Sequence, residues 1–226
     1  MSQPAASPLL PTIAFIGGGN MASAIIGGLI HQGHPASQIE VVEPWAEARE
    51  ALRKNYGIEA QAEAGPALQR AQIVVWAVKP QTFRDAAAQA KAHTQGALHL
   101  SVAAGIRSDS IAQWLGTERI VRTMPNTPAL VGKGMSALYA RPAVSAPERQ
   151  SIEAIMATTG EFLWVDSEPQ LDAVTALSGS GPAYVFYFLE AMTRAGTGMG
   201  LTEQQAHQLS GGTFVGASEL ARRSDA

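Results

Sequence analysis

The chain has 226 residues, 46% of them apolar and 15% charged, and its formal net charge is −3. This composition is typical of a packed chain of one large or two smaller domains and argues against disorder. The small negative charge provides no basic field for nucleic acid or anionic lipid, and the lack of cysteine excludes disulfides and thiolate catalysis.

Residues 1–11 contain three prolines and neither Lys nor Arg, which does not fit a secretory signal. We therefore expect a disordered N-terminal tail and a cytoplasmic location. No stretch reaches the roughly 18 uninterrupted apolar residues that a membrane-spanning helix needs, so we expect no membrane segment.

Strands and helices alternate from residue 12 onward. The expected strands are Thr12–Ile16, Ile39–Glu43, Ile73–Val78 and Ala97–Ala103. The expected helices between them are Met21–Ile30, Ala46–Asn55 and Thr82–His93. Strands separated by helices predict parallel βαβ units, that is, an α/β Rossmann domain with a doubly wound, mainly parallel sheet.

Past Arg122 the alternation is interrupted by Met124–Pro128, where two prolines exclude a continuous helix or a central strand. We expect a loop of fixed shape there. Two further strands, Met135–Ala140 and Phe162–Val165, with a helix over Pro147–Thr159 between them, complete the predicted sheet.

The last part of the chain is expected to be helical only. Ala183–Ala195 is apolar on nearly every face, and a second helix is expected over Glu203–Ala221. A tail of about 55 residues cannot bury such a helix alone, so a partner chain or missing residues must cover it. We place a Rossmann domain at 12–167 and a C-terminally incomplete all-α domain at 168–226.

A glycine-rich motif follows the first predicted strand and opens the first helix, as a dinucleotide fingerprint should. Gly17 permits a tight turn, Gly19 lets the backbone approach a pyrophosphate, and Ala22 lets the helix pack close to the sheet. A glycine-rich turn without a ligand is the alternative. The expected cofactor-binding residues are Gly17, Gly18, Gly19, Asn20, Met21 and Ala22.

Glu43 ends the second predicted strand, where an acid accepts a hydrogen bond from the ribose 2′-hydroxyl of NAD and repels the 2′-phosphate of NADP. This position favours NADH, unless Glu43 is only a solvated carboxylate. Lys79 follows the third predicted strand, so it either faces the cofactor or an acidic substrate or is a surface lysine. The small residues of Ser101–Gly105 let a nicotinamide or ribose approach the backbone, or they serve helix packing.

Ser178, Gly179, Ser180 and Gly181 precede the Pro182 helix and lack the strand that a hydrolase nucleophile elbow requires. Their backbone amides suit a substrate carboxylate, and an interdomain turn with a helix cap is the alternative. We expect no metal, because the five histidines lack the spacing of helical ligands and fit surface or capping roles. The histidines are His31, His34, His93, His99 and His207.

The acidic residues near the domain junction could form a paired acid site. A solvated linker and a first helical turn explain them better, because that junction is rich in charge. They are Asp166, Glu168 and Asp172.

Five motifs together resemble the pyrroline-5-carboxylate reductase family over nearly the whole chain from Thr12. The pair RTMPNTP and LSGSGPAY, about fifty residues apart, is the specific part of the resemblance. The motifs are Phe15–Ala22 (FIGGGNMA), Ala77–Pro80 (AVKP), Ser101–Gly105 (SVAAG), Arg122–Pro128 (RTMPNTP) and Asp172–Tyr184 (DAVTALSGSGPAY).

The resemblance implies a Rossmann domain followed by an all-α dimerisation and substrate domain, with homodimers that often assemble into larger rings. It implies hydride transfer from NAD(P)H to the C=N carbon of 1-pyrroline-5-carboxylate, which yields L-proline. A protonated imine is already electrophilic, so positioning is most of the work, and no catalytic residue is identified beyond Lys79 as a candidate for orientation. The residues implied at the cofactor are Ala77, Val78, Lys79, Pro80, Ala103, Ala104, Asn126 and Thr127.

Two departures from the family pattern leave alternatives open. Family members continue into a Thr-Ser-Pro-Gly-Gly-Thr-Thr type loop that binds substrate, whereas this chain stops at Ala226, so an inactive cofactor-binding module is one alternative. Members commonly prefer NADPH, whereas Glu43 argues for NADH, so the cofactor is NADP(H) or NAD(H). A related β-hydroxyacid or imine dehydrogenase should show an additional helical-domain lysine, and no lysine follows Lys133.

Overall fold

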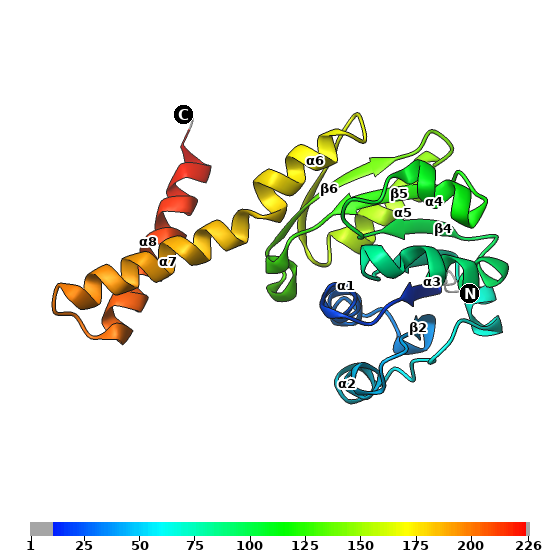
Figure 1. Cartoon of the computed structure of the whole chain (residues 1–226), viewed down its shortest axis with the longest axis horizontal. Helices are drawn as coiled ribbons and strands as arrows, with labels where there is room; N and C mark the ends of the chain where they lie inside the picture. The colour runs from blue at the N-terminus through cyan, green and yellow to red at the C-terminus, as the bar shows by residue number, and fades with distance from the viewer. Residues whose placement is uncertain (1–10, 225–226) are drawn as a thin grey trace, which may run out of the picture. The chain divides into compact units, whose positions relative to one another are not determined.

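The computed structural model describes residues 11–224 (Figure 1), so nearly all of the predicted N-terminal tail lies outside the described residues. The strands are β1 (Ile13–Ile16), β2 (Ile39–Val42), β3 (Ile73–Trp76), β4 (Leu98–Ser101), β5 (Ile120–Met124), β6 (Gly134–Ala140) and β7 (Gly160–Trp164). The α-helices are α1 (Asn20–His31), α2 (Ala46–Tyr56), α3 (Phe83–Ala90), α4 (Ser108–Leu115), α5 (Ala146–Met156), α6 (Gln170–Val174), α7 (Gly181–Gly198) and α8 (Glu203–Arg223).

The seven strands form one sheet in the order β2-β1-β3-β4-β5-β6-β7. The first five strands are parallel, β6 runs antiparallel to β5, and β7 is parallel to β6. The predicted doubly wound, mainly parallel sheet is confirmed. Its strand order reverses between β1 and β3, and open α/β sheets bind ligands at the carboxyl ends of the strands beside such a switch point.

Both faces of the sheet are covered, because alternate strand residues point to opposite faces. Ile13 and Phe15 of β1 pack in one buried cluster with residues of α1, α2 and α5. Ala14 and Ile16 pack in a second cluster with residues of α3 and α4. Burial on both faces explains why the central strands β1 and β3 are apolar throughout.

Helix α4 was not predicted from the sequence. It follows the small residues after β4, and only Ile111, Ala112 and Leu115 mark its buried side. Gly116 ends the helix in the left-handed conformation with φ +74°. A helix of eight residues offers too few turns for its periodicity to stand out from the flanking loops.

Residues 180–224 form a compact unit separate from the unit that ends at Gly179. Within it α7 and α8 lie side by side, with Gly196 of α7 close to Ala206 of α8. Large apolar side chains of α7 stay exposed, among them Phe186 at 61% and Tyr187 at 69%. The domain boundary near Glu168 stays a prediction. Among the described residues, no helix is long and apolar enough to cross a membrane.

Candidate cofactor and substrate site

The glycine-rich turn after β1 lies against the end of β3. Gly17 has φ +97°, and a Cβ on it would come within 2.6 Å of the carbonyl oxygen of Ala77. The Ala77 amide in turn donates to the Ile16 carbonyl over 2.8 Å. The structure thus brings Gly17 and Ala77 together at the switch point, where only glycine permits both the turn and the close approach.

The next step of the turn is open. A Cβ on Gly19 would meet nothing within 4 Å, and Gly19 caps α1 without any side-chain hydrogen bond. The first amides of α1, from Asn20 onward, therefore face this open space without a capping side chain. Backbone donors at the start of a 12-residue helix fit a pyrophosphate, so these residues fit a dinucleotide.

Glu43 is not a solvated carboxylate at the strand end. Its side chain is buried, and its Oε2 accepts a hydrogen bond of 2.7 Å from the Gly18 amide. Its Oε1 accepts a second bond of 2.9 Å from the Trp45 amide. The acid therefore joins the glycine turn to the start of α2, a role that spacing along the chain could not reveal.

The residues after β3 and β4 lie at the carboxyl edge of the sheet. Ala77 and Val78 are half-buried, whereas Lys79 and Pro80 are exposed and lead into the short 3₁₀ turn Pro80–Thr82. After β4, Ala103 is buried and Ala104 is exposed. Because parallel strands end at the same edge, the turns after β1, β3 and β4 together line the carboxyl edge of the sheet, as the motifs predicted.

A second junction links the loop after β5 to the segment before α7. The Asn126 side chain donates from Nδ2 to the Ser178 carbonyl over 3.1 Å and accepts at Oδ1 from the Met135 amide over 2.9 Å. Thr127 beside it is exposed and begins a 3₁₀ turn. Two of the predicted site segments, 52 residues apart, are thereby joined directly.

The segment Ser178–Gly181, expected either to present backbone amides to a carboxylate or to form an interdomain turn with a helix cap, is helical along its length. Ser178 and Gly179 belong to a π-helical turn, η6 (Thr175–Gly179), and Gly181 already begins α7. Ser180 between them has right-handed helical dihedral angles. Single π-turns inside helices are often found at functional sites, and sequence patterns do not reveal them.

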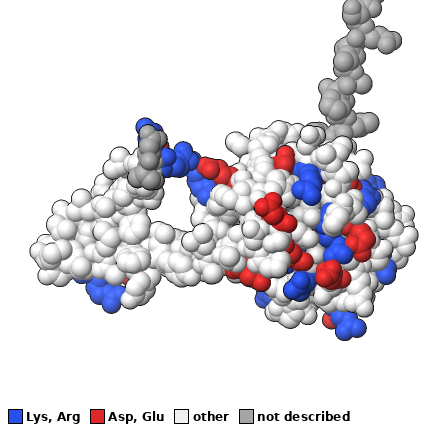
Figure 2. Space-filling view, turned by 90° about the horizontal axis from the view of Figure 1, so that it is seen from above, with Lys and Arg blue, Asp and Glu red and all other residues white. Residues whose placement is uncertain are grey.

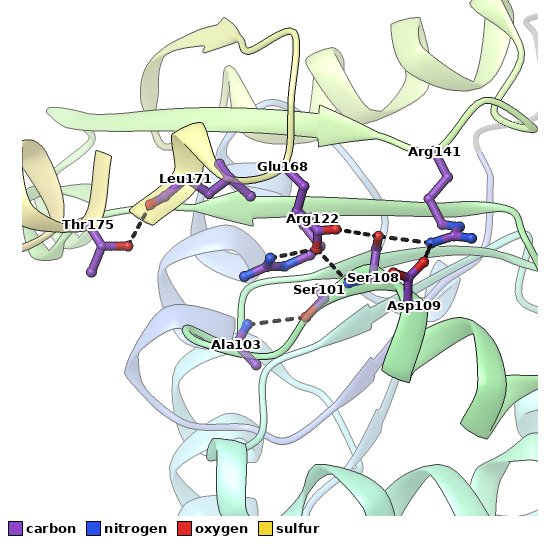
Figure 3. Close-up of polar contacts among 9 residues, drawn as sticks. All are labelled: Ser101, Ala103, Ser108, Asp109, Arg122, Arg141, Glu168, Leu171 and Thr175. Atoms are coloured by element: carbon purple, nitrogen blue, oxygen red, sulfur yellow. Dashed lines mark hydrogen bonds and ion pairs between the residues drawn. The ribbon is translucent and has the colours of Figure 1, made fainter. Parts of the chain in front are cut away.

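A buried ion pair that the sequence did not predict joins β5 to the segment before α6 (Figure 3). Arg122 of β5 donates from Nη1 to Glu168 Oε1 over 2.6 Å, and both side chains are less than a tenth exposed. Glu168 also accepts from the amide and the hydroxyl of Ser108 at the start of α4. The prediction that Glu168 belongs to a solvated linker is wrong, because its side chain is buried. The sequence did not reveal this, because its partners Ser108 and Arg122 lie far away along the chain.

The carboxyl of Glu168 is held ionised by these partners. Burial by itself raises its pKa, but the Ser108 amide, the Arg122 guanidinium and the Ser108 hydroxyl together lower that pKa below its ordinary value. Arg141 extends the cluster by donating to the Ser108 hydroxyl over 3.0 Å and to Asp109 over 2.5 Å. The cluster ties α4, β5 and the segment before α6 to one another.

The expectation that all five histidines are solvated or cap helices is wrong for two of them. His99 on β4 is 1% exposed, and its Nδ1 accepts a hydrogen bond of 3.0 Å from the Trp76 indole N–H. Burial, with the nearby charge of Arg119, lowers the pKa of His99 to about 4. His34 is also buried, and burial lowers its pKa. These rings serve the core and not the site.

Comparison with known families divides the chain into two matches. Residues 12–105 match the model of NADP oxidoreductases, coenzyme F420-dependent, and residues 168–226 match the model of the pyrroline-5-carboxylate reductase dimerisation domain. The first match contains the glycine turn and the ends of β3 and β4. The second contains the π-helical turn and the apolar helices.

Similar curated proteins agree with both matches. The chain is 45% identical over 217 residues to a pyrroline-5-carboxylate reductase of Pseudomonas aeruginosa. The aligned region covers 95% of this chain and 80% of that protein. It is 34% identical to the pyrroline-5-carboxylate reductase of Pisum sativum, over 93% of this chain and 77% of that protein. The chain thus spans about four fifths of the length of these relatives.

Solved structures agree in fold. A pyrroline-5-carboxylate reductase from Coxiella burnetii superposes with a TM-score of 0.87 at 35% identity, over 96% of this chain and 81% of that chain. A pyrroline carboxylate reductase from Plasmodium falciparum with NADP bound has a TM-score of 0.85 at 27% identity, over 96% of this chain and 80% of that one.

Proposed function

Because the chain belongs to the pyrroline-5-carboxylate reductase family, we propose that it reduces 1-pyrroline-5-carboxylate to L-proline with NAD(P)H. One observation of its own geometry carries this function: the glycine turn packs against Ala77 at Gly17 and is open at Gly19, at the carboxyl ends of β1 and β3. The cofactor supplies a hydride for the C=N carbon of the substrate.

The residues of this chain bind and orient the two reactants. The amides at the start of α1 hold the pyrophosphate, and the small residues Ala103 and Ala104 leave room for the nicotinamide. Asn126 positions Ser178 by donating a hydrogen bond to its carbonyl oxygen. The backbone amides of residues 178–181 are the proposed contacts of the substrate carboxylate. No proton donor is assigned to a side chain, because the protonated imine already attracts the hydride.

We propose further that the chain acts as a homodimer through residues 168–226, and that dimers assemble into a larger ring. The dimerisation-domain match and the exposed aromatic side chains of α7 support the dimer. The ring rests on the family resemblance alone, and light scattering after gel filtration tests it. A cytoplasmic location is proposed because the reduced cofactor is available there, and cell fractionation tests it.

The deciding experiment measures oxidation of NADPH and NADH by the purified chain with 1-pyrroline-5-carboxylate, together with cofactor titration and product analysis. Formation of proline is the expected result. Cofactor binding without turnover would instead favour the non-catalytic binding module. Turnover of a β-hydroxyacid but not of the imine would favour the related dehydrogenase, and failure to bind either cofactor would contradict the site itself.

A further inference from the structure

The end of β2 carries two side chains of opposite charge that bear on cofactor choice. In Rossmann folds, an acid at this point accepts a hydrogen bond from the 2′-hydroxyl of NAD, whereas a nearby arginine accommodates the 2′-phosphate of NADP. This chain has both residue types, Glu43 just after β2 and Arg49 in the first turns of α2. Their contacts distinguish their tasks.

Both oxygens of the Glu43 carboxylate already accept hydrogen bonds from the protein itself. The residue is 6% exposed, and the donors are the backbone N–H groups of Gly18 over 2.7 Å and of Trp45 over 2.9 Å. A Cβ on Gly18 would come within 3.3 Å of the Cβ and Cγ of Glu43, so this side chain packs directly beneath the glycine turn. Little carboxylate surface is left for a ribose hydroxyl.

The Arg49 guanidinium is held at the same strand end without a counter-charge. Its Nη1 donates to the carbonyl oxygens of Glu43 over 2.9 Å and Pro44 over 2.7 Å. Among the described residues it forms no ion pair, and it is partly exposed. Arg53, one turn further along α2, instead pairs with Glu50 through two hydrogen bonds. Arg49 is therefore a fixed cation with free donors at the end of β2.

We propose that Arg49 binds the 2′-phosphate of NADP(H), and that Glu43 is a positioning residue for the glycine turn, so that the chain prefers NADPH. A phosphate dianion would meet a guanidinium already held by two backbone carbonyls, whereas both oxygens of the buried carboxylate already accept hydrogen bonds from backbone amides. The inference rests on the proposed function only in requiring the dinucleotide at the glycine turn.

The test titrates adenosine 2′,5′-bisphosphate and adenosine 5′-monophosphate, which differ only in the 2′-phosphate, into the full chain. The unchanged protein should bind the bisphosphate at least about tenfold more tightly than the monophosphate. Arg49→Met should abolish most of this difference. Arg53→Met, the matched control on the same helix, should preserve it.

Glu43→Gln separates the two roles of the acid. The glutamine amide would face a backbone N–H with a donor, so a positioning role predicts weaker binding of NADPH and NADH by similar factors. A tenfold gain of NADPH over NADH in this variant would instead show that Glu43 acts on the ribose. Equal weakening of both adenosine ligands by Arg49→Met, or none, would overturn the role of Arg49.

These titrations need no substrate, so they separate this inference from the proposed reaction. A protein that binds the bisphosphate through Arg49 but forms no proline would contradict the reductase and uphold the phosphate site. A protein that forms proline but shows no difference between Arg49→Met and Arg53→Met would uphold the reductase and contradict the phosphate site.

Discussion

Gly17 and Gly19 belong to one turn but are needed for different reasons. Gly17→Ala would place a Cβ 2.6 Å from the Ala77 carbonyl at φ +97°, so it should destabilise the fold by about 1–3 kcal/mol as well as weaken cofactor binding. Gly19→Ala has free space and φ −72°, so it should leave the unfolding midpoint unchanged and raise the cofactor Kd about tenfold. Thermal unfolding and cofactor titration of both variants check this contrast.

Lys79 is an exposed side chain at the end of β3, beside the turn that holds Gly17. If its ammonium contacts a cofactor phosphate, Lys79→Ala should raise the KM for the cofactor several-fold with little change in kcat. Lys91→Ala, which removes an exposed lysine after α3, is the matched control and should have no effect. Unchanged kinetics of Lys79→Ala would remove Lys79 from the site.

His99 makes stability depend on pH. Its folded pKa of about 4 lies below its ordinary value of 6.5, so the unfolded chain binds the proton more readily and stability rises with pH between these values. At pH 5 the buried ring should cost about 2 kcal/mol relative to pH 7. His99→Gln, which keeps an acceptor for Trp76, should reduce that dependence in urea unfolding, and His31→Gln at an exposed position should not.

At the scale of elements, the Arg122–Glu168 pair joins β5 to the segment before α6. Glu168→Gln leaves a buried guanidinium without its counter-charge, so we expect a loss of about 3–5 kcal/mol in urea unfolding. Glu118→Gln, which weakens the exposed pair with Arg141, should cost under about 1 kcal/mol.

The pair can be tested for coupling with a double variant. Arg122→Met combined with Glu168→Gln should cost less than the sum of the single changes, because no charge is then left unpaired. Since the folded pKa of Glu168 lies below 4.5, its stabilisation should persist above that pH and decrease as the pH falls through the folded value. Additive costs would show that the two side chains act independently.

For the assembled molecule, the exposed apolar surface of α7 and α8 is the proposed subunit interface. Figure 2 shows few charged side chains on the visible face of these helices, and Phe186 lines a groove of about 680 Å³ between them. Phe186→Glu should weaken the dimer at least about thirtyfold, since buried aromatic anchors contribute about 2 kcal/mol or more.

Light scattering at graded protein concentrations checks the expected shift of Phe186→Glu toward the monomer. Gln89→Glu adds the same charge at an exposed position of α3 and should leave the mass unchanged. A dimer of unaltered affinity in Phe186→Glu would place the subunit interface elsewhere.

Reading along the chain was enough to predict the βαβ order as far as β4, the glycine turn, the apolar helix in need of a partner and the family. Each of these features produces a local periodicity or a contiguous motif, so residues that are close together along the chain are enough to detect it. Strand β5, the short helix α4 and the π-helical turn were not predicted, because none of them leaves a periodic signal of sufficient length.

Which polar side chains are buried, and what they bind, became known only from the folded structure. Glu43 turns beneath Gly18, Glu168 meets Arg122 across 46 residues, and His99 accepts a hydrogen bond from Trp76. The state of a charge depends on burial and on partners that the fold brings from distant positions. Local sequence identifies a carboxylate or an imidazole, but only packing sets its environment.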